Sequence, residues 1–392
     1  MRFGKQWLAE FPLDPDIVYL NHGTVGVTPR RVLEAQRALI ETIEQQPSRF
    51  LLRELTEALG GPASDRVPRM RVAAAEVAAF VGASADDLVF VDNATTGINA
   101  VLRSFPFRSG DELLVADLGY GGVANAAAFA ARDRGATLRV LTMPFPFSAD
   151  ALVQAWREAI GPRTRLAIVD HISAESALVL PVARIAAALH ERDVAVLVDG
   201  AHAPGAIPLD IPGLGVDYYV GNLHKWAWTP RSSGILWAPP ARQAGLHPTV
   251  ISWGLDQGFT AEFDLVGTRD PSSHLSAPAA IALFHEWGLD AIRDYNHKMA
   301  WHGACRLAEA WGTEPVAPES MVGTMATVPL PEAAGRDRDD AVRLRAALLA
   351  EDGIEVQMHA YRQRVHARIS GQIYNDMEDV DRLAHAVRRR LT

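Results

Sequence analysis

The sequence predicts an α/β protein built on a mostly parallel seven-stranded sheet covered by helices, followed by a smaller α+β unit. Two observations indicate this. Short apolar runs recur between residues 88 and 237, and helical patterns separate most of them. After about residue 271 the rhythm changes to one long helical region, followed by short strands and further helices. Continuous apolar strands that alternate with helices are typical of sheets buried on both faces, and such sheets bind ligands beyond the carboxyl ends of their strands.

The individual elements follow from these patterns, in chain order. A helix is expected at 28–46, with Thr28 as its cap and Pro29 at its first position, where proline fits without losing a hydrogen bond. Apolar runs predict strands at residues 88–91, 113–116, 138–141, 166–169, 194–198, 218–221 and 234–237. Apolar residues at helical spacing predict helices at residues 97–104, 122–134, 149–159 and 182–191.

The C-terminal part reads as a separate, smaller unit. It contains a helical region at 277–311 that is interrupted near Gly288. Strands are predicted at residues 325–328, 354–357 and 365–370, and helices at residues 339–351 and 377–391. We place the large domain at residues 18–270, and we assign residues 1–17 and 271–392 to the small domain with its N-terminal arm.

Composition excludes several classes of protein. The 392 residues carry 38 basic and 47 acidic side chains, a net charge of −9, which lacks the basic footprint of nucleic-acid binding. The single cysteine, Cys305, leaves no intramolecular disulfide framework and no cysteine-rich zinc site. The N-terminal residues contain no long apolar run, and the most apolar stretch, 178–198, is interrupted by charges. We therefore expect a cytoplasmic protein that binds a small molecule, without nucleic acid, membrane or metal.

The strongest chemical signal is an acid and a lysine at the ends of two neighbouring strands. Asp199 ends one predicted strand, and Lys225 follows the next. Alone, such an acid is often a helix cap and such a lysine a solvated side chain. Together at one sheet edge they are what pyridoxal phosphate (PLP) needs, because the lysine forms a Schiff base with the aldehyde and the carboxylate keeps the pyridine nitrogen protonated.

Several motifs resemble those of the class V aminotransferase family, a group of fold-type I PLP enzymes. These are Asp199-Gly200-Ala201-His202 and Gly221-Asn222-Leu223-His224-Lys225-Trp226. More narrowly, two further motifs resemble the isopenicillin N epimerase-like branch, which also contains C–S lyases. They are Tyr19-Leu20-Asn21-His22-Gly23-Thr24-Val25-Gly26 and Asn93-Ala94-Thr95-Thr96-Gly97-Ile98-Asn99. The resemblance covers about residues 18–370 and implies a PLP cofactor and an amino-acid substrate.

This resemblance implies roles for individual residues. Ala94 and Thr95, at a helix start, would hold the phosphate with Asn222 and His224. Tyr120 would lie over the pyridine ring. His202 would reach the 3-oxygen or the ring face. The alternatives are ordinary ones, namely a helix cap, a loop tyrosine and a loop histidine.

Other implied contacts come from further along the chain. Gly267 and Thr268 would reach the phosphate of the neighbouring subunit, which implies a homodimer with shared active sites. Arg368 would bind the substrate α-carboxylate with its planar guanidinium. Asn21, His22 and Thr24 would cover the substrate from the N-terminal loop.

Cys305 lies within a helical pattern and is interpreted as a packing residue. Cysteine desulfurases of this class carry their acceptor cysteine on a mobile loop, so this position argues against desulfurase chemistry. His171 and Ser173 follow a predicted strand and are weaker candidates to face the cofactor.

The sequence thus predicts PLP chemistry at Cα of an amino acid or amino-acid conjugate, without fixing the reaction. Epimerisation is the first hypothesis, because the Asn21 and Asn93 motifs point to that branch. Its second acid would be Tyr120, His202, Asn21 or His22. Cleavage of a C–S bond and transamination remain open, since they share Lys225 and Asp199. A non-enzymatic α/β binding protein is the distant alternative, and it would lack the absorption of bound PLP.

Overall fold

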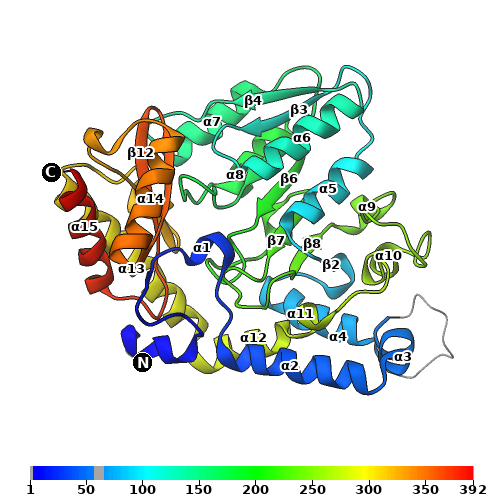
Figure 1. Cartoon of the computed structure of the whole chain (residues 1–392). Coiled ribbons are helices and arrows are strands. Elements are labelled where there is room, and N and C mark those ends of the chain that lie inside the picture. Colours follow the sequence, from blue (N-terminus) through cyan, green and yellow to red (C-terminus); the bar gives the residue numbers. More distant parts are fainter. Residues whose placement is uncertain (1–2, 57–65, 392) are drawn as a thin grey trace.

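The computed structural model describes residues 3–56 and 66–391, and a seven-stranded sheet lies at its centre (Figure 1). The strand order is β2-β8-β7-β6-β5-β3-β4, and all neighbours are parallel except the two pairs that involve β8. The strands are β2 (Leu88–Val91), β3 (Glu112–Ala116), β4 (Thr137–Leu141), β5 (Thr164–Asp170), β6 (Ala195–Gly200), β7 (Tyr218–Asn222) and β8 (Gly234–Trp237). The predicted fold class is confirmed.

Both faces of this sheet are covered, because apolar side chains alternate along each strand. In β5, Leu166 and Ile168 join one hydrophobic cluster, whereas Ala167 and Val169 join the other. The first cluster includes residues of α5 (Ala94–Ser104), α6 (Gly121–Asp133) and α10 (Phe259–Asp264). The second includes residues of α4 (Arg69–Phe80), α7 (Ala149–Ala159), α8 (Val182–His190) and α12 (Ala277–Trp287).

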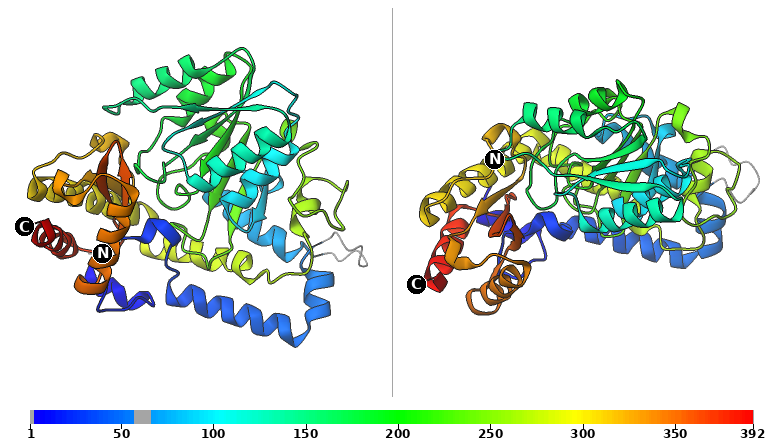
Figure 2. Two further views of the ribbon diagram at one scale, coloured as in Figure 1. Left: turned by 45° about the horizontal axis from the view of Figure 1, so that its top comes forward. Right: turned by 90° about the horizontal axis from the view of Figure 1, so that it is seen from above.

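The C-terminal unit is a three-stranded antiparallel sheet of order β11-β12-β9, with its own apolar core. Its strands are β9 (Met325–Pro329), β11 (Gln357–Tyr361) and β12 (Arg364–Ser370). The helices α13 (Leu289–Trp311), α14 (Arg338–Asp352) and α15 (Met377–Leu391) contribute to that core. Figure 2 shows this unit beside the large sheet, and Gly288 separates α12 from α13 as predicted.

The predicted strand at 354–357 is divided. Ile354–Glu355 form β10, which pairs in parallel with β1 (Val18–Tyr19), and β11 begins at Gln357. The N-terminal strand therefore joins the C-terminal unit, although the domain assignment placed residue 18 in the large domain. The division at residues 270 and 271 stays a prediction, and Met1 and Arg2 of the arm lie outside the described residues.

Two N-terminal helices differ in detail from the prediction. The helix α2 (Arg30–Gln45) has Pro29 as its cap, so the expected Thr28 cap is wrong. The Thr28 hydroxyl instead donates to the Thr229 carbonyl, because the preceding segment packs against the large sheet domain. The short α1 (His22–Val25) lies between the two units in Figure 1.

The remaining elements are short connecting helices. They are η1 (Lys5–Glu10), α3 (Pro47–Arg49), η2 (Phe50–Glu54), η3 (Ala85–Asp87), η4 (Pro212–Leu214), α9 (Pro240–Gln243), α11 (Ser272–Leu275), η5 (Glu319–Met321) and η6 (Glu332–Ala334). Within the described ranges, every helix is too short or too polar to cross a bilayer.

Candidate active site

A cavity of about 680 Å³ lies at the carboxyl ends of β5, β6 and β7. Its walls come from α1, the start of α5, the loop before α6, and the ends of these strands. Nine of the residues predicted for the site line it, namely Thr24, Ala94, Thr95, Tyr120, Asp199, His202, Asn222, His224 and Lys225. Residues more than 130 positions apart in the sequence thus meet in one place.

Lys225 stands in the turn three residues after β7, rather than at the strand end. Its Nζ atom lies 3.1 Å from Nε2 of His202. Desolvation by the cavity walls, followed by the charge of Arg368, lowers the lysine pKa, Asp199 opposes both, and the net value is about 7. In the described part of the chain no carboxylate forms an ion pair with it, so the amine is available as a nucleophile near neutral pH.

Asp199 is the penultimate residue of β6 and is only 4% exposed. Its Oδ1 atom accepts a hydrogen bond of 3.0 Å from the Ala201 amide. Burial raises the pKa of this carboxyl, whereas the Ala201 amide and Lys225 lower it. A carboxylate held at the floor of the cavity suits a cationic ring nitrogen.

A second buried acid lines the cavity and was missed by the sequence reasoning. Asp170 ends β5 and pairs directly with Asp199 in the parallel ladder. The available signal was the same one that identified Asp199, a continuous apolar strand that ends in aspartate.

The start of α5 provides an anion site whose amides are partly occupied. The Ala94 amide donates to Oδ1 of Asn222 at 2.8 Å, and the Thr96 amide donates to Oδ1 of Asn93 at 2.9 Å. The Thr95 amide has no hydrogen-bond partner among the described residues. Asn222 therefore orients the helix start, and Thr95 is the free donor at the positive end of the helix dipole.

His224 and Arg231 stand on the same side of the cavity. Nδ1 of His224 contacts the Ser233 carbonyl at 3.0 Å, and desolvation lowers the imidazole pKa to about 4. Arg231 lines the cavity and donates to the Gly26 carbonyl, a role that the sequence reasoning missed. Tyr120 lines the cavity just before α6 and is 51% exposed.

Arg368 is buried on β12 and reaches the cavity wall from behind. Its guanidinium donates to Oγ1 of Thr24 at 2.7 Å and to the carbonyl of Ala174, and both of these partners line the cavity. Its Nε atom is buried without a hydrogen-bond partner in the described structure. Burial lowers the arginine pKa to about 10, which leaves the group cationic at neutral pH.

The other two N-terminal candidates do not line the cavity. Asn21 donates to Glu355 at 2.7 Å. His22 is fully buried, and its two ring nitrogens contact the Tyr374 hydroxyl and the Lys225 carbonyl at 2.9 and 3.0 Å. A Cβ atom on Gly26 would lie 1.9 Å from the His224 carbonyl, so this segment packs directly on the lysine turn. The geometry favours a supporting role for His22.

Gly267 and Thr268 lie away from the cavity of their own chain. They line a separate small pocket beside Leu52 and Trp253, whose side chains are 48% and 72% exposed. The adjacent Arg269 donates to Asp92 at the cavity rim. A contact of Thr268 with a neighbouring subunit stays a prediction.

The weaker candidates also lie outside the cavity. Nδ1 of His171 contacts the Tyr219 hydroxyl beneath the sheet edge, and Ser173 contacts Ser176. Cys305 is a partly exposed residue within α13. Across residues 3–56 and 66–391, no cluster of three or more His, Cys, Asp or Glu is placed to hold a metal.

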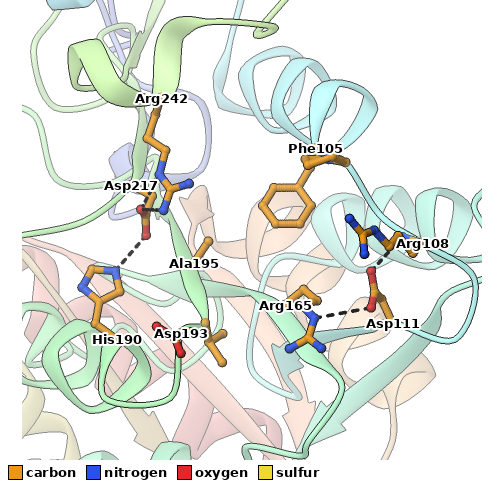
Figure 3. Close-up of a pocket in the computed structure, with 11 residues that line it drawn as sticks. Phe105, Arg108, Asp111, Arg165, His190, Asp193, Ala195, Asp217 and Arg242 are labelled. Carbon is orange, nitrogen blue, oxygen red and sulfur yellow. Dashed lines mark hydrogen bonds and ion pairs between the residues drawn. The ribbon is translucent and has the colours of Figure 1, made fainter.

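Another cavity of about 660 Å³ lies at the amino ends of the strands (Figure 3). Several of its charged groups are paired with one another. Asp217 accepts from His190 at 2.8 Å and from Arg242 at 2.7 Å, and Asp111 pairs with Arg165. None of the three lysines of the sequence lines it, so it offers no amine for an aldehyde.

The donor set at the carboxyl ends fits PLP. The free Thr95 amide suits a phosphate, and the deprotonatable Lys225 suits an aldehyde. The buried His202 Nδ1 atom, which has no partner in the described structure, is a further polar atom for a ligand.

Comparisons with known proteins agree with this geometry. The chain is 34% identical to a protein named putative L-cysteine desulfhydrase 1 from Oryza sativa subsp. japonica, covering 95% of this chain and 83% of that protein. It is 31% identical to the isopenicillin N epimerase of Streptomyces clavuligerus, covering 96% and 95%. A structure of a C-DES mutant with glycine covalently linked to the PLP cofactor is similar in fold, with a TM-score of 0.78, 22% identity, and coverage of 97% and 98%. The profile of the family described as aminotransferase class-V matches residues 18–383, and the chain therefore belongs to that family of PLP-dependent enzymes, as its motifs predicted.

Proposed function

We propose that this chain is a PLP-dependent lyase that cleaves the Cβ–S bond of cysteine or a cysteine conjugate. The observation that carries the proposal concerns the second acid that epimerisation requires. Of the four candidates, His202 stands against Lys225, His22 is engaged on both ring nitrogens, and Asn21 does not line the cavity. Only Tyr120 remains, and β-elimination does not require it, because that reaction needs no second acid.

The cofactor would be held at two ends. Thr95, His224 and Arg231 would take the phosphate, and Asp199 would face the ring nitrogen. When bound through Lys225, PLP supplies an electron sink for the pair of electrons released at Cα.

The side chains of this protein would perform the proton chemistry. Lys225, with a pKa near 7, would remove the proton from Cα once the substrate amine has displaced it. Arg368 would hold the α-carboxylate in place of one of its present partners, Thr24 or the Ala174 carbonyl. With Cα so fixed, the thiol on Cβ can leave, and hydrolysis of the remainder gives pyruvate and ammonia.

The names of relatives support this choice. The rice relative is named a putative L-cysteine desulfhydrase and C-DES a cystine C–S lyase, so both names refer to sulfur amino acids. The epimerase of Streptomyces clavuligerus supports the second candidate, Cα epimerisation, for which Tyr120 is the remaining candidate acid in the cavity.

Incubation of the PLP-loaded enzyme with L-cysteine, L-cystine or an S-substituted cysteine tests the proposal. We expect stoichiometric pyruvate, ammonia and a sulfur product, without inversion of L-alanine in deuterated water. Inversion at Cα without loss of sulfur would establish the epimerase instead, and the Tyr120→Phe variant should then abolish the inversion.

We further propose that the enzyme is a cytoplasmic homodimer. The exposed Trp253 and Leu52 beside Thr268 support a subunit interface at this surface, because large apolar side chains in a group are commonly covered by a partner.

A further inference from the structure

Asp170 and Asp199 are direct neighbours on two parallel strands. They are register partners at the carboxyl ends of β5 and β6. Leu166 and Ile168 of β5 pack on the same face of the sheet as Leu197 of β6, so alternation puts both acids on that face. Both line the cavity, and their exposed fractions are 7% and 4%.

The two carboxyls have different surroundings. Asp199 accepts the Ala201 amide and faces Lys225, and both favour its ionised form. Apart from its own backbone amide, the Asp170 side chain has no hydrogen-bond or ion-pair partner among the described residues. It packs against the loop before Tyr120, where a Cβ atom on Gly119 would lie 3.3 Å from its Oδ2 atom.

Two buried negative charges on adjacent strands repel strongly, and no arginine or lysine of the described structure forms an ion pair with either carboxyl. From this placement we propose that Asp170 and Asp199 act as a carboxyl pair that shares one proton, carried by Asp170. Burial and the neighbouring Asp199 both raise the pKa of Asp170, in agreement with the geometry.

The pair gives Asp170 a positioning role that acts through Asp199. One negative charge shared by the pair would balance one cationic ring nitrogen, whereas two ionised carboxylates would leave one buried negative charge without a counter-charge. A neutral Asp170 can also donate its O–H to the Asp199 carboxylate and fix the orientation of that group. This role rests on the PLP site and holds for lyase and epimerase alike.

The first test measures stability and needs neither cofactor nor activity. Thermal unfolding midpoints of the cofactor-free full-length chain are compared with those of Asp170→Asn between about pH 4 and pH 8. Because its pKa is raised in the folded chain, Asp170 destabilises the folded state at pH values above the ordinary carboxyl pKa. The asparagine variant should therefore have the higher unfolding midpoint at pH 8, and the difference between the two midpoints should close as the pH falls toward 4. Asp117→Asn, at the exposed end of β3, is the matched control and should follow the wild type.

Other titrating groups face the pair, and the comparison cancels their effects. They are Lys225 from the turn after β7, His202 from the turn after β6, Tyr219 from β7 and His171 after β5. All are present in each variant, so only the difference between the chains reports on Asp170. An unchanged gap across the pH range, or a lower midpoint for Asp170→Asn at pH 8, would overturn the proposal.

The second test detects the shared proton itself. Infrared spectra at neutral pH should contain the carbonyl band of a protonated carboxylic acid in the wild type and in Asp117→Asn, but not in Asp170→Asn. With PLP added, Asp170→Asn retains a neutral donor and should bind within about threefold of the wild type, whereas Asp170→Ala should bind at least about tenfold more weakly. Equal losses in the two Asp170 variants, or a band that persists in Asp170→Asn, contradict the pair. Absence of PLP binding in the wild type itself would instead contradict the cofactor assignment. The infrared result would then decide whether Asp170 and Asp199 share a proton.

Discussion

Nζ of Lys225 lies 3.1 Å from Nε2 of His202, so the amine and the imidazole are within hydrogen-bond distance at the turn after β7. Burial, followed by the charge of Lys225, holds the His202 pKa well below its ordinary value. The imidazole is therefore neutral at pH 7 and can accept a hydrogen bond from the amine. This contact orients the lysine toward the cavity.

The first prediction is that Lys225 alone carries the cofactor. Borohydride reduction of the PLP-loaded protein should leave a stable adduct on Lys225, and Lys225→Ala should abolish both the adduct and turnover. The sequence contains only two other lysines, Lys5 and Lys298, so peptide mapping is unambiguous. Lys298→Ala, which removes an exposed lysine paired with Asp294, should behave as the wild type. An adduct on another lysine would refute the assignment.

The second prediction concerns the pH dependence of stability. The Lys225 pKa is lowered from 10.5 to about 7, so its favourable contribution is complete above pH 10.5 and is lost as the pH falls to about 7. Methionine does not titrate, so the Lys225→Met variant does not lose this stability as the pH falls. Its unfolding midpoint, relative to the cofactor-free wild type, should rise between about pH 10 and pH 7 and then stay constant. Lys298→Met should show no such trend, and a flat difference for Lys225→Met would contradict the lowered pKa.

The third prediction concerns the charge of Asp199. Asp199→Asn removes the carboxylate that would face the ring nitrogen, and turnover should fall at least ~100-fold, or ~2.7 kcal/mol in transition-state stabilisation. PLP should still bind, which its visible absorption reports. The exposed strand-end variant Asp117→Asn is the control. Near-wild-type turnover in Asp199→Asn would remove the proposed role.

The strand-end residues were the most predictable part of the site. Asp199 and Lys225 stand beside continuous apolar strands, and parallel topology alone brings such positions together. Asp170 follows the same rule but was not proposed for the site, because a single acid was sought to partner Lys225.

Contacts between the units could not be read from local patterns. The pairing of β1 with β10, and the burial of His22 between Tyr374 and Lys225, join residues that are about 200 to 350 positions apart. Likewise, the Asn222 side chain accepts the Ala94 amide, and its contact with phosphate stays a prediction. Such partners depend on how distant segments pack, which hydrophobic periodicity does not encode.

The fourth prediction is that Arg368 anchors the substrate carboxylate. Arg368→Lys loses the planar pair of donors and should raise KM at least about 30-fold, roughly 2 kcal/mol, with a smaller change in kcat. Arg364→Lys, on the same face of β12, is the matched control. Steady-state kinetics with an amino-acid substrate decide the matter, and an unchanged KM in Arg368→Lys would exclude the anchoring role.

The last prediction is that each active site is shared between two subunits. Thr268 is exposed and does not line the cavity of its own chain, so its expected contact with phosphate requires a neighbour. We expect Lys225→Ala and Thr268→Arg each to be inactive alone. In a mixed dimer, one site would combine an intact Lys225 with an intact Thr268 from the other chain.

Co-expression of the two variants should therefore restore roughly a quarter of the wild-type activity, because half of randomly formed dimers are mixed and each contains one complete site. If Thr268 acted within its own subunit, no mixed dimer would contain a complete site. Co-expression of Lys225→Ala with Asp199→Ala is the control, since both defects lie in the same cavity and neither arrangement restores it. A fully active monomer in sedimentation would also contradict sharing, because Thr268 would then have no neighbouring phosphate to reach.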